Sequence, residues 1–458
     1  MKPLLIFKNF IISYCLVTFL ALVLFAGCQK DNLMEISKEG LHAPGIQTSL
    51  ALEKIILEVN FQMTTEGMSD EQIQEQYSEM MGHLSEEDRN RLIAVAQSAL
   101  DQEYPYSPGH MVSPRSVESI LTTGNINDDF GSGVATVGNK VYVGAKTIQR
   151  VYEYSKTGGT YSLINEITPD PATINFGTTL SVSGSWMAVS APRTAATGGG
   201  RVFMYKKQGN EWVQKVILTG PPGNENFGGG VLIGNTLVAH SRAPGVPSSW
   251  TSTISVFALN GNEWTLQQEL VQPGIYHRVV KLDASENRMA TSSGLGNAFG
   301  LPRSLIYVRD GLTWTLEDEV IINLPDVGAS TMVAIDGDNL LLLAAFPGYK
   351  HLMLTNNGGD WQLSQELIVP VSLPNASRFA QIEGEKLVIG VGSFSNAVSE
   401  AVYVFENFGA SWDLTETLIP SDLGVNCSMN SIALEGNTIV AGCWNAGPAF
   451  AGKAYVFE

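Results

Sequence analysis

The chain has 458 residues, of which 46 are glycine and only 16% are charged, and its formal net charge is -18. This length allows one large core together with a smaller unit, and few charges with much glycine suit an all-β surface better than a helical one. A surface this acidic repels phosphate backbones, so nucleic acid is excluded as a partner.

Residues 1–28 have the layout of a secretory signal, with Lys2 and Lys8 around the start of an apolar run from Phe10 to Phe25. The run ends in Leu24-Phe25-Ala26-Gly27-Cys28, which resembles the bacterial lipobox. The alternative is a plain transmembrane anchor, but such an anchor does not require small residues and a cysteine at its end. The resemblance implies cleavage before Cys28, acylation of that cysteine and attachment to a membrane through the lipid. The remaining chain would then carry a net charge of about −20.

Residues 29–46 are expected to form a tether. Gln29-Lys30-Asp31-Asn32 is similar to the surface-export signal of Bacteroidota lipoproteins, which usually carries two consecutive acidic residues. Asn32 stands in the place of the second one. We therefore expect an outer-membrane lipoprotein that faces either the cell surface or the periplasm.

Residues 47–104 have the apolar spacing of short amphipathic helices, and residues 105–114 are typical of a linker because three prolines interrupt them. The first helical stretch shows its apolar face at Leu52, Ile55, Ile56 and Val59. Two further stretches follow Ser69 and Ser85, whose side chains can cap helices. We predict three short helices ahead of the main domain.

From residue 115 to the end the chain repeats itself with a period of about 50 residues. An apolar residue closes one strand of each unit: Leu121, Ile167, Leu218, Leu270, Val320, Leu367 and Leu418. Six residues before six of these anchors stands an aromatic residue: Tyr161, Trp212, Trp264, Trp314, Trp361 and Trp412. We read these rings as fillers of the wedges between repeats. Four strands per unit predict an all-β, seven-bladed β-propeller over residues 115–458.

The last unit stops at Tyr455-Val456-Phe457-Glu458, one strand short of a complete blade. Residues 115–121 have the register of the missing strand, although Arg115 stands where the other units have an aromatic residue. We therefore predict that this N-terminal strand is the outer strand of the seventh blade and closes the ring.

Each unit also has a two-residue hairpin turn, such as Gly138-Asn139 or Gly436-Asn437, whose positive φ values favour glycine and asparagine. In the first three units a Phe-Gly pair opens the first strand: Phe130-Gly131, Phe176-Gly177 and Phe227-Gly228. With Ser190-Ala191-Pro192 and Arg242-Ala243-Pro244, these pairs resemble the FG-GAP repeats of integrin α chains and bacterial surface proteins. The resemblance covers residues 115–458 and weakens after the third unit.

Integrin-type blades often carry a calcium loop of alternating Asp and Asn. The nearest matches are Asn125, Asn127 and Asp129, and Asp336 with Asp338, and neither stretch has the full run of oxygen ligands. Side-chain-capped turns explain both better, so we predict no cofactor and no metal site. Cys427 and Cys443 are expected to form a disulfide in an oxidising compartment, the alternative being two buried thiols.

No hydrolase, metalloprotease or nucleotide-binding motif occurs, and the histidines are scattered, so no catalytic residue is assigned and the chain is not expected to be an enzyme. The connections between second and third strands are long and differ from unit to unit, which is where binding usually resides. The candidates on this long-loop face are Arg193, His240, Arg242, Trp250, Phe299, Arg303, Tyr349, His351, Phe394 and Trp444.

These features predict a lipid-anchored binding or adhesion module for a protein or a carbohydrate. The alternatives are a glycan-active lyase or hydrolase on the same face, since propellers host such enzymes, and an architectural subunit of the cell envelope.

Overall fold

The protein is described from a computed structural model. The residues it describes are 118–193, 199–243, 252–272, 279–293, 303–322, 330–344, 350–369, 377–392, 401–409, 411–421, 427, 429–446 and 451–458. These residues contain strands and no helix, and therefore no helix that could span a membrane. The predicted signal, tether, helices and linker lie outside them. The chain divides into two compact units, Met1–Ser107 and Pro108–Glu458, and the described residues belong to the second.

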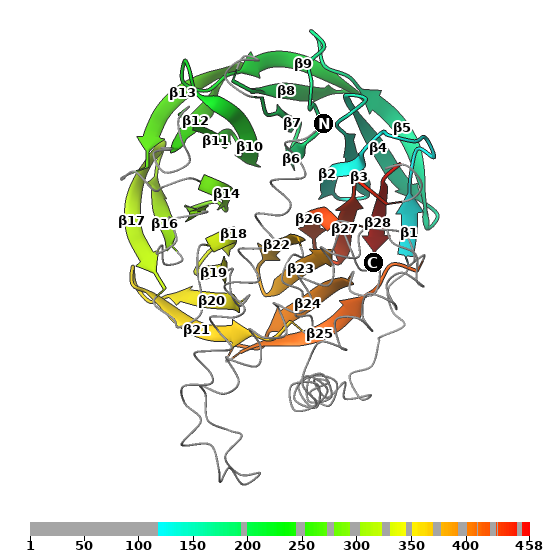
Figure 1. Ribbon diagram of the computed structural model, residues 1–458. Coiled ribbons are helices and arrows are strands. Elements are labelled where there is room, and N and C mark those ends of the chain that lie inside the picture. The colour runs from blue at the N-terminus through cyan, green and yellow to red at the C-terminus, as the bar shows by residue number, and fades with distance from the viewer. Residues whose placement is uncertain are drawn as a thin grey trace, which may run out of the picture. The chain divides into compact units, whose positions relative to one another are not determined.

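The second unit is a seven-bladed β-propeller, which confirms the predicted fold class (Figure 1). Each blade is an antiparallel sheet of four strands, numbered from the centre of the ring to its rim. The outer strand of the seventh blade comes from the N-terminal side of the domain, as predicted.

The first four blades, in chain order, contain these strands. Blade 1 has β2 (Phe130–Val137), β3 (Lys140–Ala145), β4 (Arg150–Thr157) and β5 (Thr160–Ile167). Blade 2 has β6 (Thr179–Ser183), β7 (Trp186–Ala191), β8 (Arg201–Gln208) and β9 (Glu211–Leu218). Blade 3 has β10 (Glu225–Ile233), β11 (Thr236–Arg242), β12 (Ser252–Asn260) and β13 (Glu263–Val271). Blade 4 has β14 (Val279–Ala284), β15 (Arg288–Ser293), β16 (Arg303–Asp310) and β17 (Thr313–Ile321).

The remaining three blades complete the ring. Blade 5 has β18 (Ser330–Asp336), β19 (Asn339–Ala344), β20 (Lys350–Asn356) and β21 (Trp361–Leu367). Blade 6 has β22 (Ser377–Glu383), β23 (Lys386–Gly392), β24 (Ala401–Asn407) and β25 (Trp412–Leu418). Blade 7 has β26 (Met429–Glu435), β27 (Thr438–Cys443), β28 (Lys453–Phe457) and, from the other end, β1 (Glu118–Leu121).

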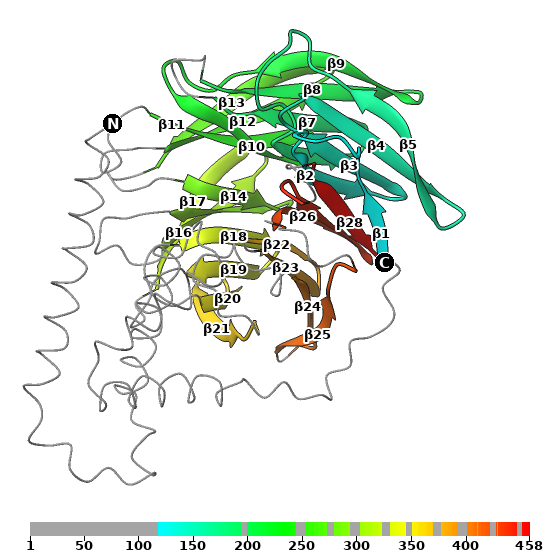
Figure 2. The same ribbon diagram turned by 45° about the vertical axis from the view of Figure 1, so that its right-hand side comes forward.

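The ring closes because β1 pairs with β28. Glu118 lies opposite Phe457 and Leu121 lies opposite Ala454, in an antiparallel register without a shift. In both views the cyan β1 lies beside the dark red β28 (Figures 1 and 2). The other outer strands, β5, β9, β13, β17, β21 and β25, each skip one residue three positions after their aromatic residue. Such a bulge twists an exposed edge and hinders pairing with another chain.

The hydrophobic core consists of seven clusters, and each cluster is shared by two neighbouring blades. The recurrent aromatic residues fill these wedges, as the sequence predicts. Trp264, for example, packs with residues of blades 2 and 3. Trp361 packs with residues of blades 4 and 5. No blade therefore buries its apolar surface alone, and each depends on both neighbours.

The Phe-Gly pairs join one blade to the next at close range. Phe130 of blade 1 forms a parallel bridge with Gly452 of blade 7, and Phe227 of blade 3 forms one with Gly200 of blade 2. Gly131 has a φ of 90°, and a Cβ there would lie 2.4 Å from the carbonyl oxygen of Lys453. Glycine is required at this position because backbone approaches backbone and because the φ is positive.

A second kind of contact joins blades through buried carboxylates. Glu153 of β4 is fully buried, and its carboxylate lies 2.8 Å from Lys207 Nζ and 3.0 Å from Lys140 Nζ. Trp212 of blade 2 donates to it from Nε1 at 3.1 Å. The 7–1 boundary repeats the arrangement, since the Tyr161 hydroxyl donates to Glu458 at 2.8 Å.

The boundary between blades 4 and 5 has the same kind of contact. Glu317 of β17 pairs with Arg288 at 2.8 Å and accepts a hydrogen bond from Trp361 Nε1 of blade 5. The Arg288 hydrogen bond lowers the pKa of Glu317 below its ordinary value despite partial burial.

A third set of contacts links the short hairpin turns around the centre of the ring. The residue that ends the innermost strand, or in blade 4 the residue after it, accepts a hydrogen bond from the backbone N–H of the first turn residue in the next blade. Five boundaries have this link, through Ser183–Gly234, Ser285–Gly337, Asp336–Gly384, Glu383–Gly436 and Glu435–Gly138. We call the side of the propeller that carries these turns the short-turn face.

Of the two residues in each short turn, only the first has the positive φ that the sequence predicts. Gly138 and Gly436 have φ values of 58° and 57°, whereas the asparagine that follows each does not have a positive φ. A positive φ at the first of the two turn residues, and not at the second, is typical of a type II′ turn. Blade 4 differs, because Glu286 occupies the first position without a positive φ.

Candidate functional site

The long-loop face lies opposite the short-turn face. Because neighbouring strands are antiparallel, the connections between second and third strands emerge on that side together with the links from blade to blade. In blade 3, β11 ends at Arg242 and β12 begins at Ser252. The connection between these second and third strands therefore has almost the length that the sequence predicts. Among the candidates, Trp250, Phe299, Tyr349 and Phe394 lie outside the described residues.

Three candidates gather where blades 2 and 3 meet on this face. Arg242, the last residue of β11, pairs through Nε with Glu225 of β10 at 2.9 Å, and both side chains are half-buried. The backbone carbonyl of Arg193 accepts a hydrogen bond from Asn226 N at 2.6 Å. The structure thus brings Arg193 and Arg242 together around the Phe-Gly pair of blade 3, with Arg242 already neutralised by a carboxylate.

His240 also belongs to this region, although it lies in β11 and not in a loop. It is opposite Gly228 in β10 and Ile254 in β12. A Cβ on Gly229 would lie 2.7 Å from His240 Cε1, so the imidazole packs directly on the irregular backbone of β10. The contact indicates that His240 serves to pack against the glycine-rich strand β10.

Trp444 is the fourth candidate on the face and lies where blade 7 meets blade 1. Lys146 Nζ is 4.3 Å from the centre of its ring, a cation–π contact. The same ammonium lies 3.6 Å from Asp129 Oδ2, which also accepts a hydrogen bond from the Thr147 hydroxyl at 2.6 Å. These four side chains form a polar platform around one aromatic ring, and we call it the Trp444 platform.

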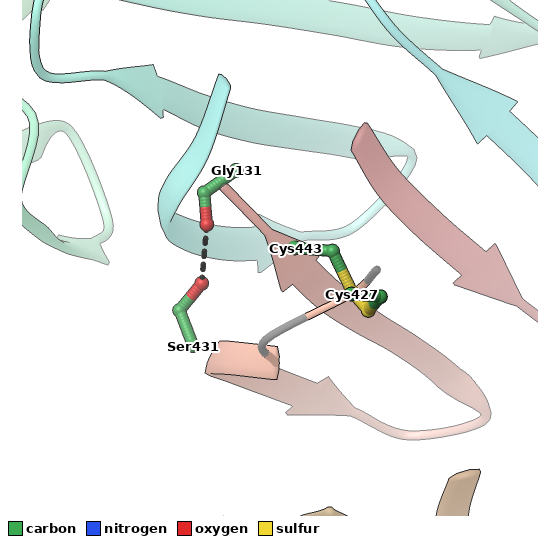
Figure 3. Close-up of a disulfide and its surroundings, with 4 residues drawn as sticks. All are labelled: Gly131, Cys427, Ser431 and Cys443. Carbon is green, nitrogen blue, oxygen red and sulfur yellow. Dashed lines mark hydrogen bonds between the residues drawn. A yellow bond between two sulfur atoms is a disulfide. The ribbon is translucent and has the colours of Figure 1, made fainter. Parts of the chain in front are cut away.

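A disulfide borders the Trp444 platform. Cys443, the last residue of β27, is bonded to Cys427, and their Cα atoms are 5.2 Å apart (Figure 3). Both cysteines are buried, and the Ser431 hydroxyl nearby donates to the Gly131 carbonyl at 3.0 Å. The bond therefore ties the residue next to Trp444 to the segment that precedes β26.

Two further predicted candidates lie in strands and not in loops. His351 is the second residue of β20 and only 3% exposed, so it cannot meet a ligand on the surface. Arg303 begins β16 and pairs with Glu319 of β17 at 2.9 Å. Blades 1 and 5 have the same pair between their third and fourth strands, Arg150–Glu166 and Lys350–Glu366. Arg303 is thus part of the repeat.

The stretch that resembles a calcium loop is organised by hydrogen bonds between its own side chains. Asp128 Oδ2 accepts from the Thr123 hydroxyl at 2.7 Å and from the Asn125 amide at 3.3 Å. Asp129 faces Lys146 instead, as described above. Within the described residues no group of three His, Cys, Asp or Glu side chains is placed to hold a metal ion.

Sequence reasoning missed the partners that occupy this face. Lys146 and Thr147 follow β3, and Glu225 precedes the third Phe-Gly pair by two residues, so each lies beside a motif that the sequence does show. The position of Glu225 just before a Phe-Gly pair could have indicated it. Nothing in the sequence could show which carboxylate meets which cation.

The chain matches no protein-family model and no curated protein. Solved structures with a similar fold include a streptogramin B lyase at 12% identity and a TM-score of 0.49, covering 76% of this chain and 99% of that one. Virginiamycin B lyase from Staphylococcus aureus has 12% identity and a TM-score of 0.49 over 75% of this chain and 99% of its own. A putative 6-phosphogluconolactonase from Bacteroides uniformis has 11% identity and a TM-score of 0.47 over 63% and 85%. At these values the similarities carry no argument about function.

Proposed function

We propose that the protein is a lipid-anchored binding module that holds a protein or a carbohydrate on the long-loop face of its propeller. The observation that carries the proposal is the difference between the two faces. The short-turn face is made of near-identical two-residue turns, most of them hydrogen-bonded to the next blade. The long-loop face is built from connections that differ from blade to blade, and a rigid scaffold with variable loops is the usual arrangement of a binding surface.

The Trp444 platform is the described part of that face with the best chemistry for recognition. An aromatic ring backed by a cation can stack on a sugar ring or anchor a protein partner. Lys146 fixes the ring, and the disulfide fixes the backbone beside it. A rigid anchor loses little conformational entropy on binding, which favours affinity.

The anchor is proposed from the sequence. The lipobox-like Leu24–Cys28 segment supports acylation of Cys28 and attachment to an outer membrane, and the Phe-Gly pairs support membership in the FG-GAP repeat group of surface proteins. Metabolic labelling with a fatty acid tests the anchor. The native chain should incorporate the label and Cys28→Ser should not, and label in the variant would contradict the proposal.

The binding face is tested with the full mature lipoprotein in a capture experiment from native membranes and on a glycan array. A specific protein or glycan should be retained, and Trp250→Ala, Tyr349→Ala and Trp444→Ala together should abolish retention. Arg303→Gln is the matched control, because Arg303 pairs with Glu319 as a feature of the repeat. Retention that survives the triple substitution would show that another surface binds. Breakdown of a polysaccharide by the purified protein would replace the binding module with a glycan-active enzyme.

A further inference from the structure

A groove of about 340 Å³ opens on the short-turn face where blades 3 and 4 meet, on the side opposite to the proposed binding face. Its walls are the hairpin turns of the two blades. Asn235 contributes from blade 3, and Glu286, Asn287 and Arg309 contribute from blade 4. The groove is therefore polar and has one cationic side chain.

The groove lies at a boundary where Gln268 of blade 3 exchanges two hydrogen bonds with the backbone of Trp314, but where the described residues provide neither the link between turns nor an inter-blade carboxylate. Ile233 ends the innermost strand of blade 3 and has no acceptor for the turn of blade 4, so the link between turns is missing here. The boundary between blades 1 and 2 also lacks that link, because Val137 ends β2, but the buried Glu153 joins those blades instead. At the 3–4 boundary Val256 occupies the repeat position of Glu153 and is buried in the wedge.

Arg309 is held in place by neutral groups. Its Nε donates to the Gly311 carbonyl at 2.7 Å, and its Nη2 donates to the Thr236 hydroxyl of blade 3 at 2.8 Å. The guanidinium carbon lies 5.8 Å from the centre of the Trp314 ring. Among the described residues no carboxylate lies within ion-pair distance of Arg309, which contrasts with Arg150, Arg288 and Arg303.

Comparison of Arg309 with the equivalent residues of other blades shows that a carboxylate partner is missing at the 3–4 boundary. Lys156, Lys207 and Arg309 occupy one repeat position, because each backbone N–H donates to the second residue of its own blade's first turn. Each of the three cations also lies over the aromatic ring that follows it, at 5.9, 4.9 and 5.8 Å. The two lysines bind a carboxylate of the preceding blade, Glu458 or Glu153. Blade 3 offers Arg309 only the hydroxyl of Thr236.

The aromatic residue of this boundary lacks its acceptor as well. Trp212 Nε1 donates to Glu153 at 3.1 Å, whereas Trp314 Nε1 is buried and has no hydrogen-bond partner among the described residues. At the 1–2 boundary Lys207 and Trp212 share the carboxylate of Glu153. At the 3–4 boundary Arg309 and Trp314 stand in the same positions without a carboxylate among the described residues. An arginine held in a fixed orientation is suited to take a planar carboxylate.

We propose that this groove binds the carboxylate of a small ligand, with Arg309 as the residue that pairs with it. Asn235 and Asn287 provide amide groups in the walls for the atoms beside the carboxylate. Glu286 disfavours a second negative charge and favours a hydroxyl or an ammonium next to the carboxylate. Uronic acids and α-amino acids share this chemistry, a single carboxylate flanked by hydrogen-bond donors.

The first experiment titrates the full mature protein with glucuronate and with alanine, using glucose and alaninamide as neutral counterparts, by calorimetry. At least one carboxylate should bind saturably while its neutral counterpart does not, and the pair that binds identifies the source. Arg309→Gln should weaken binding at least about tenfold, and Arg303→Gln should leave it unchanged. If neither carboxylate binds the native protein, or if Arg309→Gln binds as well as the native protein, the proposal is wrong.

A second experiment does not depend on the ligand. Thr236→Asp supplies a carboxylate from blade 3, as Glu153 and Glu458 do at their boundaries, so it should raise the melting temperature and compete with the ligand. The double variant with Arg309→Gln should lose that gain. A Thr236→Asp protein that is folded but no more stable would show that Arg309 does not lack a carboxylate. Both experiments concern the short-turn face, so their outcome is separate from that of the long-loop face.

Discussion

The boundary between blades 7 and 1 and the boundary between blades 3 and 4 are built on the same repeat but held in different ways. The first has a paired strand from the other end of the domain, a Phe-Gly contact, a carboxylate and a turn link. The second has an apolar wedge, an arginine bound only to neutral oxygens, and hydrogen bonds from Gln268 and Gln272 of blade 3 to Trp314 and Tyr307 of blade 4. The comparison shows that one boundary is held by charged groups and the other by neutral hydrogen bonds and apolar packing. The boundary without an inter-blade carboxylate is the one at which we propose that a ligand carboxylate binds.

The largest effect is expected from removing the closing strand. Deletion of residues 115–121 exposes β28 and removes Leu121 from the core shared by blades 7 and 1. The melting temperature of the mature protein should fall by on the order of 10 °C or more, measured by calorimetry. Ile120→Ala is the control, because that side chain is 39% exposed and its loss should change little. An unchanged melting temperature after the deletion would refute closure by this strand.

A smaller loss is expected from the buried carboxylate between blades 1 and 2. Glu153→Gln leaves the ammonium groups of Lys207 and Lys140 without a charged partner, which costs about 3 kcal/mol of unfolding free energy in buried ion pairs. Glu166→Gln is the matched control, because Glu166 and its partner Arg150 are both exposed. Chemical denaturation of the two variants measures the difference. Equal losses would show that Glu153 holds the boundary no better than a surface pair.

The effect of Glu153→Gln also depends on pH. Burial acts to raise the pKa of Glu153, but hydrogen bonds from Lys207, Asn165 and Lys140 outweigh it and hold the pKa below the ordinary value. A depressed pKa contributes stability above the pKa of the unfolded glutamate, and that stability is lost as the pH falls through the folded pKa. The native protein and the variant should therefore converge in stability only when the pH falls below the pKa of the folded Glu153 carboxyl.

The smallest effect on stability is expected from substitution of Asp283 in β14. Unlike the previous changes, this substitution should stabilise the protein at neutral pH. Burial raises the pKa of this carboxyl to about 6, even though the backbone N–H of Ile335 donates to it. A raised pKa means that its contribution to stability is complete below the unfolded pKa and is lost as the pH rises through about 6. Asp283→Asn keeps an acceptor and removes the charge, so the melting temperature should rise by a few degrees at pH 7.5 and not at pH 4. A uniform decrease at both pH values would show that the charged form is favoured.

The fold followed from the sequence because its signal is repeated seven times. The spacing of Trp264, Trp314, Trp361 and Trp412 gives the blade length, and the register of Leu121 identifies the closing strand. One irregular loop does not obscure a repeat that recurs in every blade.

The candidate site was less accessible to sequence reasoning, for physical reasons. Arg303 and Arg242 look alike in the sequence, yet the first belongs to a recurring ion pair and the second pairs with Glu225 of its own blade, beside the Phe-Gly pair of blade 3. The sequence pattern places His351 in a loop because β20 begins only one residue before it. Arg309 does not stand out in the sequence, because its proposed role depends on a carboxylate that the preceding blade does not provide.

The sharing of every core between neighbouring blades has a consequence for how the protein is made. The strand that closes the ring is among the first parts of the domain to be synthesised, and its partner β28 is the last. During synthesis, each new blade has an apolar side that stays uncovered until the next blade is made, and β1 has no partner until the last strand is complete. The ring can therefore close only after β28 has been made, and until then the unfinished blades expose apolar surface that is prone to aggregation.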